Sequence, residues 1–134
     1  MSARRRRPSM LLVALGVLVA ACASLPPARP IADMRQIAGT WTGRMTWSDG
    51  RTYDGVSTIR PDGTYEVELP ELPPVRFAGA ITVAGGEARY RSETTGRTGT
   101  ISLHEEGDRR VLIWRADDGS SVARTTPLAG GRGR

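Results

Sequence analysis

The stretch TYEVELPELPPVRFAGAITV, from Thr64 to Val83, decides the fold class. On either side of its proline-rich centre, apolar and polar residues alternate, which is the pattern of strands that bury one face. Folding the stretch about Pro70 to Pro74 places Glu68 opposite Arg76 on the polar face. The stretch therefore predicts a β-hairpin with one buried and one solvated side.

Turn signals recur on both sides of this hairpin at intervals of 10 to 13 residues. Asp-Gly and Gly-Gly pairs supply the positive φ angles that tight hairpins need. The turns predict eight strands, at 40–47, 52–60, 64–69, 75–83, 87–94, 98–105, 109–116 and 121–127. No segment between them is long enough for a crossover helix. We therefore expect an all-β fold, an eight-stranded antiparallel up-and-down meander that closes into a small barrel.

The alternation also predicts which residues fill the barrel. Most inward positions hold large side chains, and three inward glycines are expected to open space between them. The inward side chains are Trp41, Met45, Trp47, Ile59, Tyr65, Leu69, Phe77, Ile81, Tyr90, Ile101 and Leu103, and the glycines are Gly43, Gly79 and Gly99. Because eight strands enclose little room, we expect a mostly filled core with at best a shallow mouth. The apolar run from Val111 to Trp114 cannot be assigned a face.

The chain begins with a basic segment, continues with an apolar stretch from Met10 to Ala21, and then reaches its only cysteine, Cys22. This order is typical of a secretory signal, and the apolar stretch is too short for a permanent membrane span. The residues Val19-Ala20-Ala21-Cys22 resemble the lipobox of bacterial lipoproteins. The resemblance implies cleavage after residues 1–21 and acylation, as with palmitate, of Cys22. Ordinary signal cleavage after Ala21-Cys22-Ala23 is the alternative.

Residues 22–37 are expected to connect the lipid to the barrel. Three prolines between Ala23 and Pro30 favour an extended tether that would reach roughly 25 Å. Apolar spacing from Ile31 to Ala38 predicts a short helix that packs against one end of the barrel. The barrel itself is expected to span residues 38–127, and residues 128–134 to be a disordered tail.

Charge and composition exclude several classes of function. The 134-residue chain has a formal net charge of +5, and all 19 basic residues are arginine. Four of them form the run Arg4 to Arg7 within the expected signal, so the remaining chain has a net charge of only +1. An exported chain with balanced charge excludes nucleic acid as a partner. One cysteine and one histidine exclude an internal disulfide and a cysteine-built or multi-histidine metal site, and no cofactor is expected.

The first expected strand opens with Gly39-Thr40-Trp41, which resembles the G-x-W opening of lipocalins and other calycins, including the avidin-like barrels. The resemblance implies that Trp41 closes one barrel end and that an arginine of the last strand, Arg124, stacks across it. An ordinary core aromatic is the alternative for Trp41. The short strands and the missing disulfide pair depart from true lipocalins and put a deep ligand cup in doubt.

Four residues are candidates for a ligand contact or a barrel end: Trp41, Arg124, Trp47 and, in the stiff loop from Pro70 to Pro74, Leu72. Catalysis is not expected. Glu66 and Glu68 share the solvated face of one strand, where nothing raises a pKa as acid catalysis requires. His104 follows an inward residue and is expected to point outward.

These features predict a non-enzymatic lipoprotein of the cell envelope that binds a small apolar ligand or a periplasmic protein. Ala23 follows Cys22 where an aspartate is associated with inner-membrane retention, so the lipoprotein resemblance favours the periplasmic face of the outer membrane. One alternative is a periplasmic protease inhibitor, because some bacterial inhibitors of secreted metalloproteases resemble this layout, with the segment from Ala23 to Met34 entering the protease cleft. A structural component of an outer-membrane assembly is another.

Overall fold

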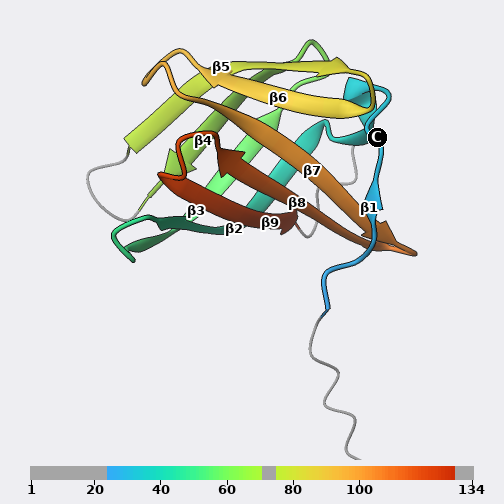
Figure 1. Ribbon diagram of the computed structural model, residues 1–134, viewed down its shortest axis with the longest axis horizontal. Coiled ribbons are helices and arrows are strands. Elements are labelled where there is room, and N and C mark those ends of the chain that lie inside the picture. Colours follow the sequence, from blue (N-terminus) through green and yellow to red (C-terminus); the bar gives the residue numbers. More distant parts are fainter. Residues whose placement is uncertain (1–23, 71–74, 129–134) are drawn as a thin grey trace, which may run out of the picture.

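The computed structural model describes residues 24–70 and 75–128 (Figure 1). The expected signal peptide, Cys22 and Leu72 lie outside these residues, as does the tail after Leu128. Within the described residues, eight antiparallel strands form a closed up-and-down barrel, preceded by a two-residue strand and one turn of 3₁₀ helix. The fold class predicted from the sequence is confirmed. No helix in the described part of the chain has the length and apolar character needed to cross a bilayer.

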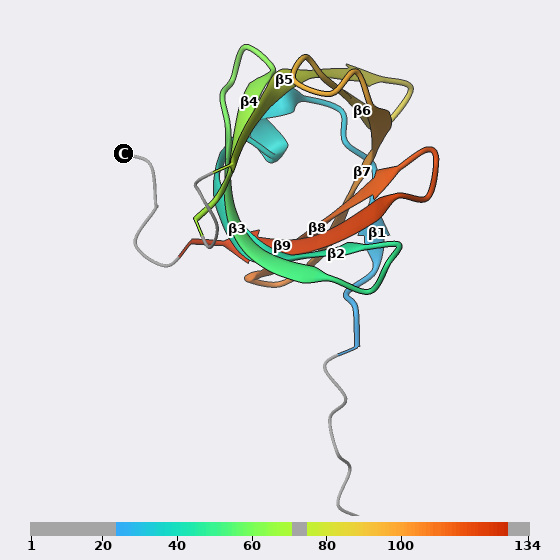
Figure 2. The same ribbon diagram turned by 90° about the vertical axis from the view of Figure 1, so that its left-hand side faces the viewer.

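All eight predicted strands are present, with ends within two residues of the predicted ones. They are β2 (Gly39–Trp47), β3 (Thr52–Ile59), β4 (Thr64–Leu69), β5 (Val75–Ala84), β6 (Glu87–Ser92), β7 (Thr98–Glu106), β8 (Arg109–Ala116) and β9 (Ser121–Pro127). Each strand pairs with the next along the chain, and β9 also pairs with β2. This last pairing closes the ring, which Figure 2 shows end-on.

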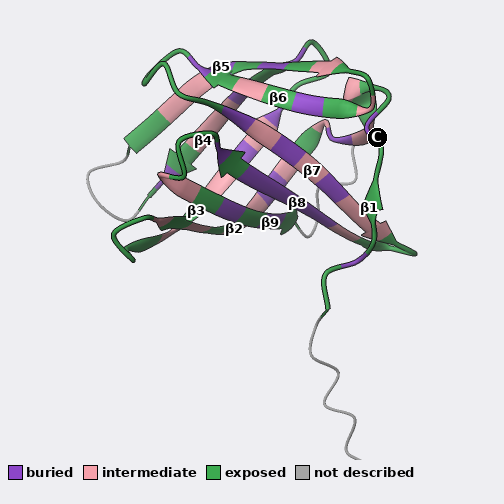
Figure 3. Cartoon of the chain, viewed as in Figure 1, coloured by how far each residue is buried: buried purple, intermediate pink, exposed green. Residues whose placement is uncertain are grey.

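The hairpin of β4 and β5 has the predicted register. Glu68 lies opposite Arg76, and a carboxylate oxygen of Glu68 is 3.8 Å from a guanidinium nitrogen of Arg76 on the exposed face. Tyr65 and Leu69 point inward and are buried. Figure 3 shows buried residues alternating with less buried ones along other strands such as β7, but not along β8. Burial of one face, not the exposed ion pair, therefore fixes this register.

The apolar run in β8 is buried on both faces of the strand. Leu112 and Trp114 belong to the core inside the barrel, whereas Val111 and Ile113 face outward and are still only 4% and 7% exposed. Val111 lies opposite His104 of β7, and Nδ1 of that histidine is 3.0 Å from the carbonyl oxygen of the buried Pro26. The N-terminal segment therefore shelters this part of the outer face, which explains why the run shows no alternation.

The proline-rich segment lies against the barrel. Its residues Ala28–Arg29 form β1, which pairs with β7 where that strand extends beyond β6. The Glu105 N–H donates to the carbonyl oxygen of Pro27 at 3.0 Å, and the Arg109 guanidinium donates to that of Ser24 at 3.0 Å. The segment thus pairs with backbone groups at the end of β7 that β6 leaves unpaired. The expectation that residues 24–30 form a free spacer of roughly 25 Å is therefore wrong.

The segment after β1 is part of the core. A single 3₁₀ turn, η1 (Met34–Gln36), lies within the segment 31–38, for which a short helix was expected. Ile31 and Ile37, on either side of it, are 1% and 0% exposed and pack into the same cluster as Trp41. The folded unit therefore begins before residue 38. The inhibitor alternative needs a protruding trunk, but residues 24–37 lie against β7 and the core.

Candidate ligand-binding cavity

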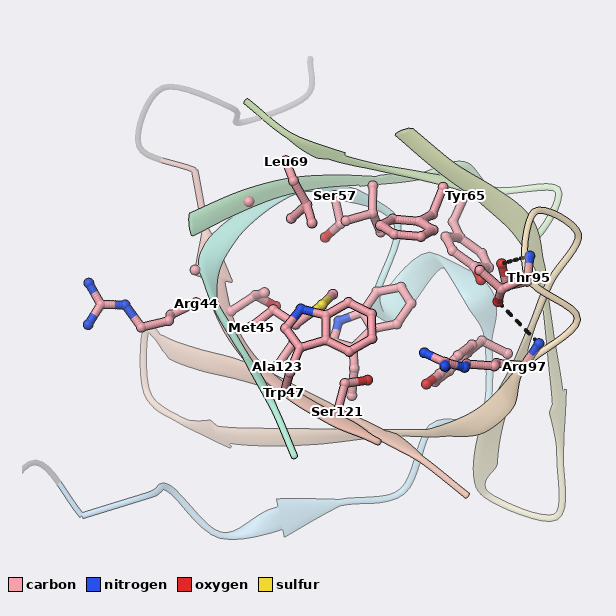
Figure 4. Close-up of a pocket in the computed structure, with 18 residues that line it drawn as sticks. Arg44, Met45, Trp47, Ser57, Tyr65, Leu69, Thr95, Arg97, Ser121 and Ala123 are labelled. Carbon is pink, nitrogen blue, oxygen red and sulfur yellow. Dashed lines mark hydrogen bonds between the residues drawn. The ribbon is translucent and has the colours of Figure 1, made fainter. Parts of the chain in front are cut away.

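The barrel is filled at one end and hollow at the other. At the filled end, beside η1, lie the largest fully buried side chains: Trp41, Ile31, Ile37, Ile59, Leu103 and Leu112. At the opposite end, a cavity of about 80 Å³ opens between the turns that follow β2, β6 and β8 (Figure 4). An apolar cavity of about 150 Å³ holds one benzene. The hollow end therefore has room for part of a single ring without rearrangement.

Apolar and aromatic side chains make up most of the cavity wall. They include Met45, Trp47, Tyr65, Leu69, Phe77, Tyr90 and Trp114. All of these except Trp114 were predicted to point inward, and the structure confirms this. No carboxylate of residues 24–70 and 75–128 takes part in the wall, and the side chain of one of its two arginines, Arg44, points away from the cavity (Figure 4).

Three aromatic rings form the inner wall. The ring centroids of Tyr65 and Trp114 are 5.3 Å apart, those of Tyr90 and Trp114 are 5.5 Å apart, and the two tyrosine rings meet edge-on at 6.2 Å. Such tilted and edge-to-face contacts stabilise aromatic clusters. Burial raises the pKa of Tyr65 to about 12 and also raises the pKa of Tyr90. Both hydroxyls therefore stay protonated at neutral pH, and these three aromatic residues of the inner wall are uncharged.

Two inward glycines make room for these tyrosines. A Cβ at Gly99 would lie 2.5 Å from the ring of Tyr90 and would overlap the carbonyl oxygen of Arg115. A Cβ at Gly79 would lie 2.8 Å from the hydroxyl oxygen of Tyr65. The expectation that these two glycines open free volume is therefore wrong, because aromatic side chains and neighbouring backbone occupy the space.

Three polar atoms of the cavity wall have no hydrogen-bond partner. They are Nε1 of Trp47, Nε1 of Trp114 and Oγ of Ser57, all buried and unpaired among the described residues. Ser57 is 3% exposed and Trp114 is 7% exposed. A buried donor without an acceptor costs about 1–3 kcal/mol. Polar groups in this state are rare in native interiors, so three of them around one cavity make it the candidate site of the described residues.

A rim arginine covers part of the mouth. The guanidinium carbon of Arg97 lies 5.4 Å from the ring centroid of Trp47, a cation–π contact, and Arg97 extends over the opening (Figure 4). The turn before β7 positions this arginine, because its backbone N–H donates to Oγ1 of Thr95 at 3.2 Å and the Thr95 N–H donates to Oγ of Ser92 at 3.2 Å. Nε of Arg97 is 3.8 Å from a carboxylate oxygen of Asp118.

Trp41 lies at the filled end, and the cation over it is not the predicted one. The guanidinium carbon of Arg110 is 5.2 Å from the centroid of the Trp41 ring. Arg124 lies opposite Arg44 on the outer face and is exposed, so the prediction that it stacks across Trp41 is wrong. The physical reason is the register between β2 and β9, which gives Arg124 the outward direction of Arg44.

Glu66, Glu68 and His104 lie outside the cavity wall. Glu66 and Glu68 pair with Arg60 at 3.3 Å and Arg76 at 3.8 Å on the exposed face. His104 faces outward, as predicted, and binds the N-terminal segment through Pro26. Within residues 24–70 and 75–128, no three side chains of histidine, cysteine, aspartate or glutamate gather as metal ligands would.

Ser57, Trp114 and Arg97 were not predicted as site residues. Trp114 belongs to the run from Val111, whose faces could not be assigned from the sequence, and Ser57 lies on the same face as Ile59 but carries only a small hydroxyl. Arg97 stands in a turn, where its sequence neighbours carry no signal of a cavity. The one available signal was Trp47, an aromatic residue at the end of a strand whose alternation points it inward.

Comparison with known proteins gives similarity of architecture only. No family model matches the sequence, and neither does any curated protein. A redesigned β-barrel of known structure covers 71% of this chain and 93% of its own at 19% identity and a TM-score of 0.49. A de novo designed fluorescence-activating β-barrel covers 72% of this chain and 98% of its own at 24% identity and a TM-score of 0.47. The class that the fold and the site define is a small closed meander barrel with one hollow end.

Proposed function

We propose that this chain is a non-enzymatic binding module that takes a small apolar molecule into the hollow end of its barrel. The observation that carries the proposal is an apolar, aromatic cavity with three unpaired polar atoms in its wall. Each buried donor that lacks an acceptor costs the fold about 1–3 kcal/mol. A ligand that fills the cavity and pairs the polar atoms would offset that cost.

Titration with one-ring compounds, followed by amide chemical shifts, tests the proposal. We expect saturable shifts at the cavity wall with toluene or a similar compound. Ala123→Leu should abolish them, because Ala123 is a buried residue of the wall and the larger side chain fills the cavity. Val122→Leu is the matched control, since its neighbour Val122 is 36% exposed and outside the cavity. Absence of saturable binding by any one-ring compound would refute the proposed function.

We also propose that the protein acts in the cell envelope, held by lipid on Cys22 at the periplasmic face of the outer membrane. The support is the lipobox-like residues Val19 to Cys22 after a basic and apolar leader. Two or three acyl chains, at about 0.8 kcal/mol per buried CH₂, would hold the chain on a membrane permanently. Intact mass of the mature protein tests this, with Cys22→Ser as the control. A mature wild-type chain without acyl mass would contradict lipid attachment.

A further inference from the structure

We infer that the ligand of the cavity is a one-ring aromatic molecule with an anionic, hydrogen-bond-accepting group, such as an aromatic carboxylate. The inference rests on the proposed function and adds the chemical class of the ligand. Three features of the cavity carry it: the kind of polar atoms left unpaired, the charge at the mouth and the shape of the wall.

The unpaired atoms call for an acceptor. An indole N–H can only donate a hydrogen bond, so Nε1 of Trp47 and Nε1 of Trp114 both need an acceptor. The hydroxyl of Ser57 can donate as well. An ammonium group on a ligand would leave both indole groups unpaired, and a hydrocarbon would leave all three atoms unpaired. A carboxylate offers two oxygens with several lone pairs and can accept from more than one of them.

The charge at the mouth favours an anion. Among the described residues, Arg97 is the only charged residue of the wall whose side chain lies over the opening, since that of Arg44 points away and forms an ion pair with Asp54 (Figure 4). The nearest carboxylate to Arg97 is that of Asp118 at 3.8 Å, a long contact between half-exposed side chains. Such a contact is weak and is readily exchanged for a ligand carboxylate. Among the described residues no acidic side chain belongs to the wall, and the carboxylates of Asp117 and Asp118, in the turn beside the mouth, pair with Arg89 and Arg97.

The shape of the wall selects a single ring. The rings of Tyr65, Tyr90 and Trp114 present edges and faces to the cavity at tilted angles, which suits another flat ring. The volume of about 80 Å³ admits part of a single ring, so a whole ring enters only when a wall side chain moves, and fused ring systems need still more room. The unpaired nitrogens are covered by neighbouring side chains, so the ligand reaches them by displacing one.

Four compounds of similar size and different head groups test the inference: benzoate, benzamide, toluene and benzylamine. Titrated at neutral pH by chemical shift or calorimetry, benzoate should bind about tenfold more tightly than toluene, because pairing one buried donor is equivalent to that factor. Benzylamine should bind most weakly. Binding of toluene as tight as that of benzoate, or a preference for benzamide or benzylamine, would overturn the inference while leaving the proposed function intact. If no compound binds, both fail.

Variants of the wall assign the effect to its atoms. Trp114→Phe keeps a ring but removes the N–H, and should weaken benzoate about tenfold and toluene less than twofold. Ser57→Ala is a smaller change at a second unpaired atom and should also weaken benzoate more than toluene. It provides the same test if Trp114→Phe does not fold. Arg97→Gln should weaken benzoate and remove the salt dependence of its binding. The control is Arg91→Gln, on the exposed outer face. It should change neither the affinity for benzoate nor the salt dependence of that affinity. Equal losses for benzoate and toluene in Trp114→Phe and Ser57→Ala would overturn the inference.

Discussion

Arg110 and Trp41 face each other at the filled end of the barrel, with the guanidinium carbon 5.2 Å from the centroid of the indole. The same guanidinium donates to the carbonyl oxygen of Gln36, and Nε1 of Trp41 donates to that of Ile37 at 2.8 Å. One arginine on β8 and one tryptophan on β2 thus both bind the backbone of the segment that includes η1. This pair therefore adds to the β1–β7 pairing and the buried isoleucines in attaching the N-terminal segment to the barrel.

Arg110→Met should destabilise the fold by about 1–3 kcal/mol, because it removes the cation–π contact and leaves a carbonyl group without its donor. Arg124→Met removes an exposed arginine from the outer face and should change stability by less than about 0.5 kcal/mol. Urea unfolding of both variants measures the difference. Equal losses would contradict the assignment of Arg110 as the cation over Trp41.

Gly99→Ala should destabilise the barrel by about 2 kcal/mol or more, because the new methyl group meets the Tyr90 ring and the Arg115 carbonyl. Gly96→Ala is the comparison. Gly96 has a φ of 75° but nothing within 4 Å of an added Cβ, so only backbone strain of about 1 kcal/mol applies. Thermal unfolding compares the stability lost in the two variants. A larger loss in Gly96→Ala than in Gly99→Ala would show that the contacts around Gly99 do not prevent an added methyl group there.

Alkaline pH should weaken the fold through Tyr65. Burial raises its pKa from 10.0 to about 12, so between these values the folded state holds a proton that the unfolded state has lost. Stability from this group is therefore complete below pH 10 and is lost as the pH rises towards 12. The loss should be on the order of 1 kcal/mol, since the hollow end is partly open to solvent. Urea unfolding at pH 9 and 11 should show a smaller pH effect in Tyr65→Phe than in the wild type.

Ile31→Ala should cost about 2–4 kcal/mol, as expected for a side chain that is 1% exposed in the core. Leu25→Ala, in the same segment, should cost less than about 1 kcal/mol because Leu25 is 38% exposed. Chemical unfolding of the mature domain measures both. A near-neutral effect of Ile31→Ala would show that the fold does not need the residues before 38.

The strands and the register of the β4–β5 hairpin could be predicted because their signals are local. Alternation in Tyr65 to Leu69 and the turn at Pro70 to Pro74 together determine which side chains meet, and Glu68 does lie opposite Arg76. Regular turns then leave only a closed antiparallel meander as the arrangement that pairs every long strand.

Features that depend on pairing between distant strands could not be predicted. Whether Arg110 or Arg124 lies over Trp41 follows from the β2–β9 register, which no local pattern gives. The inward direction of Trp114 could not be predicted, because Val111 and Ile113 on the outer face are also buried and the run does not alternate. The outer face beside Val111 meets a segment about 80 residues earlier in the chain, through His104 and Pro26. The residues of the cavity were therefore the hardest to predict from the sequence.

The contact between Ser24 and Arg109 also sets an orientation. Arg109 begins β8 next to Arg110, at the filled end, so the chain arrives at the side of the barrel opposite the mouth. Ala23 alone separates Ser24 from Cys22 in the sequence. With acyl chains on Cys22, the filled end would rest near the headgroups and the opening would face away from them. The ligand would then be exchanged with the aqueous compartment and not with the interior of the bilayer.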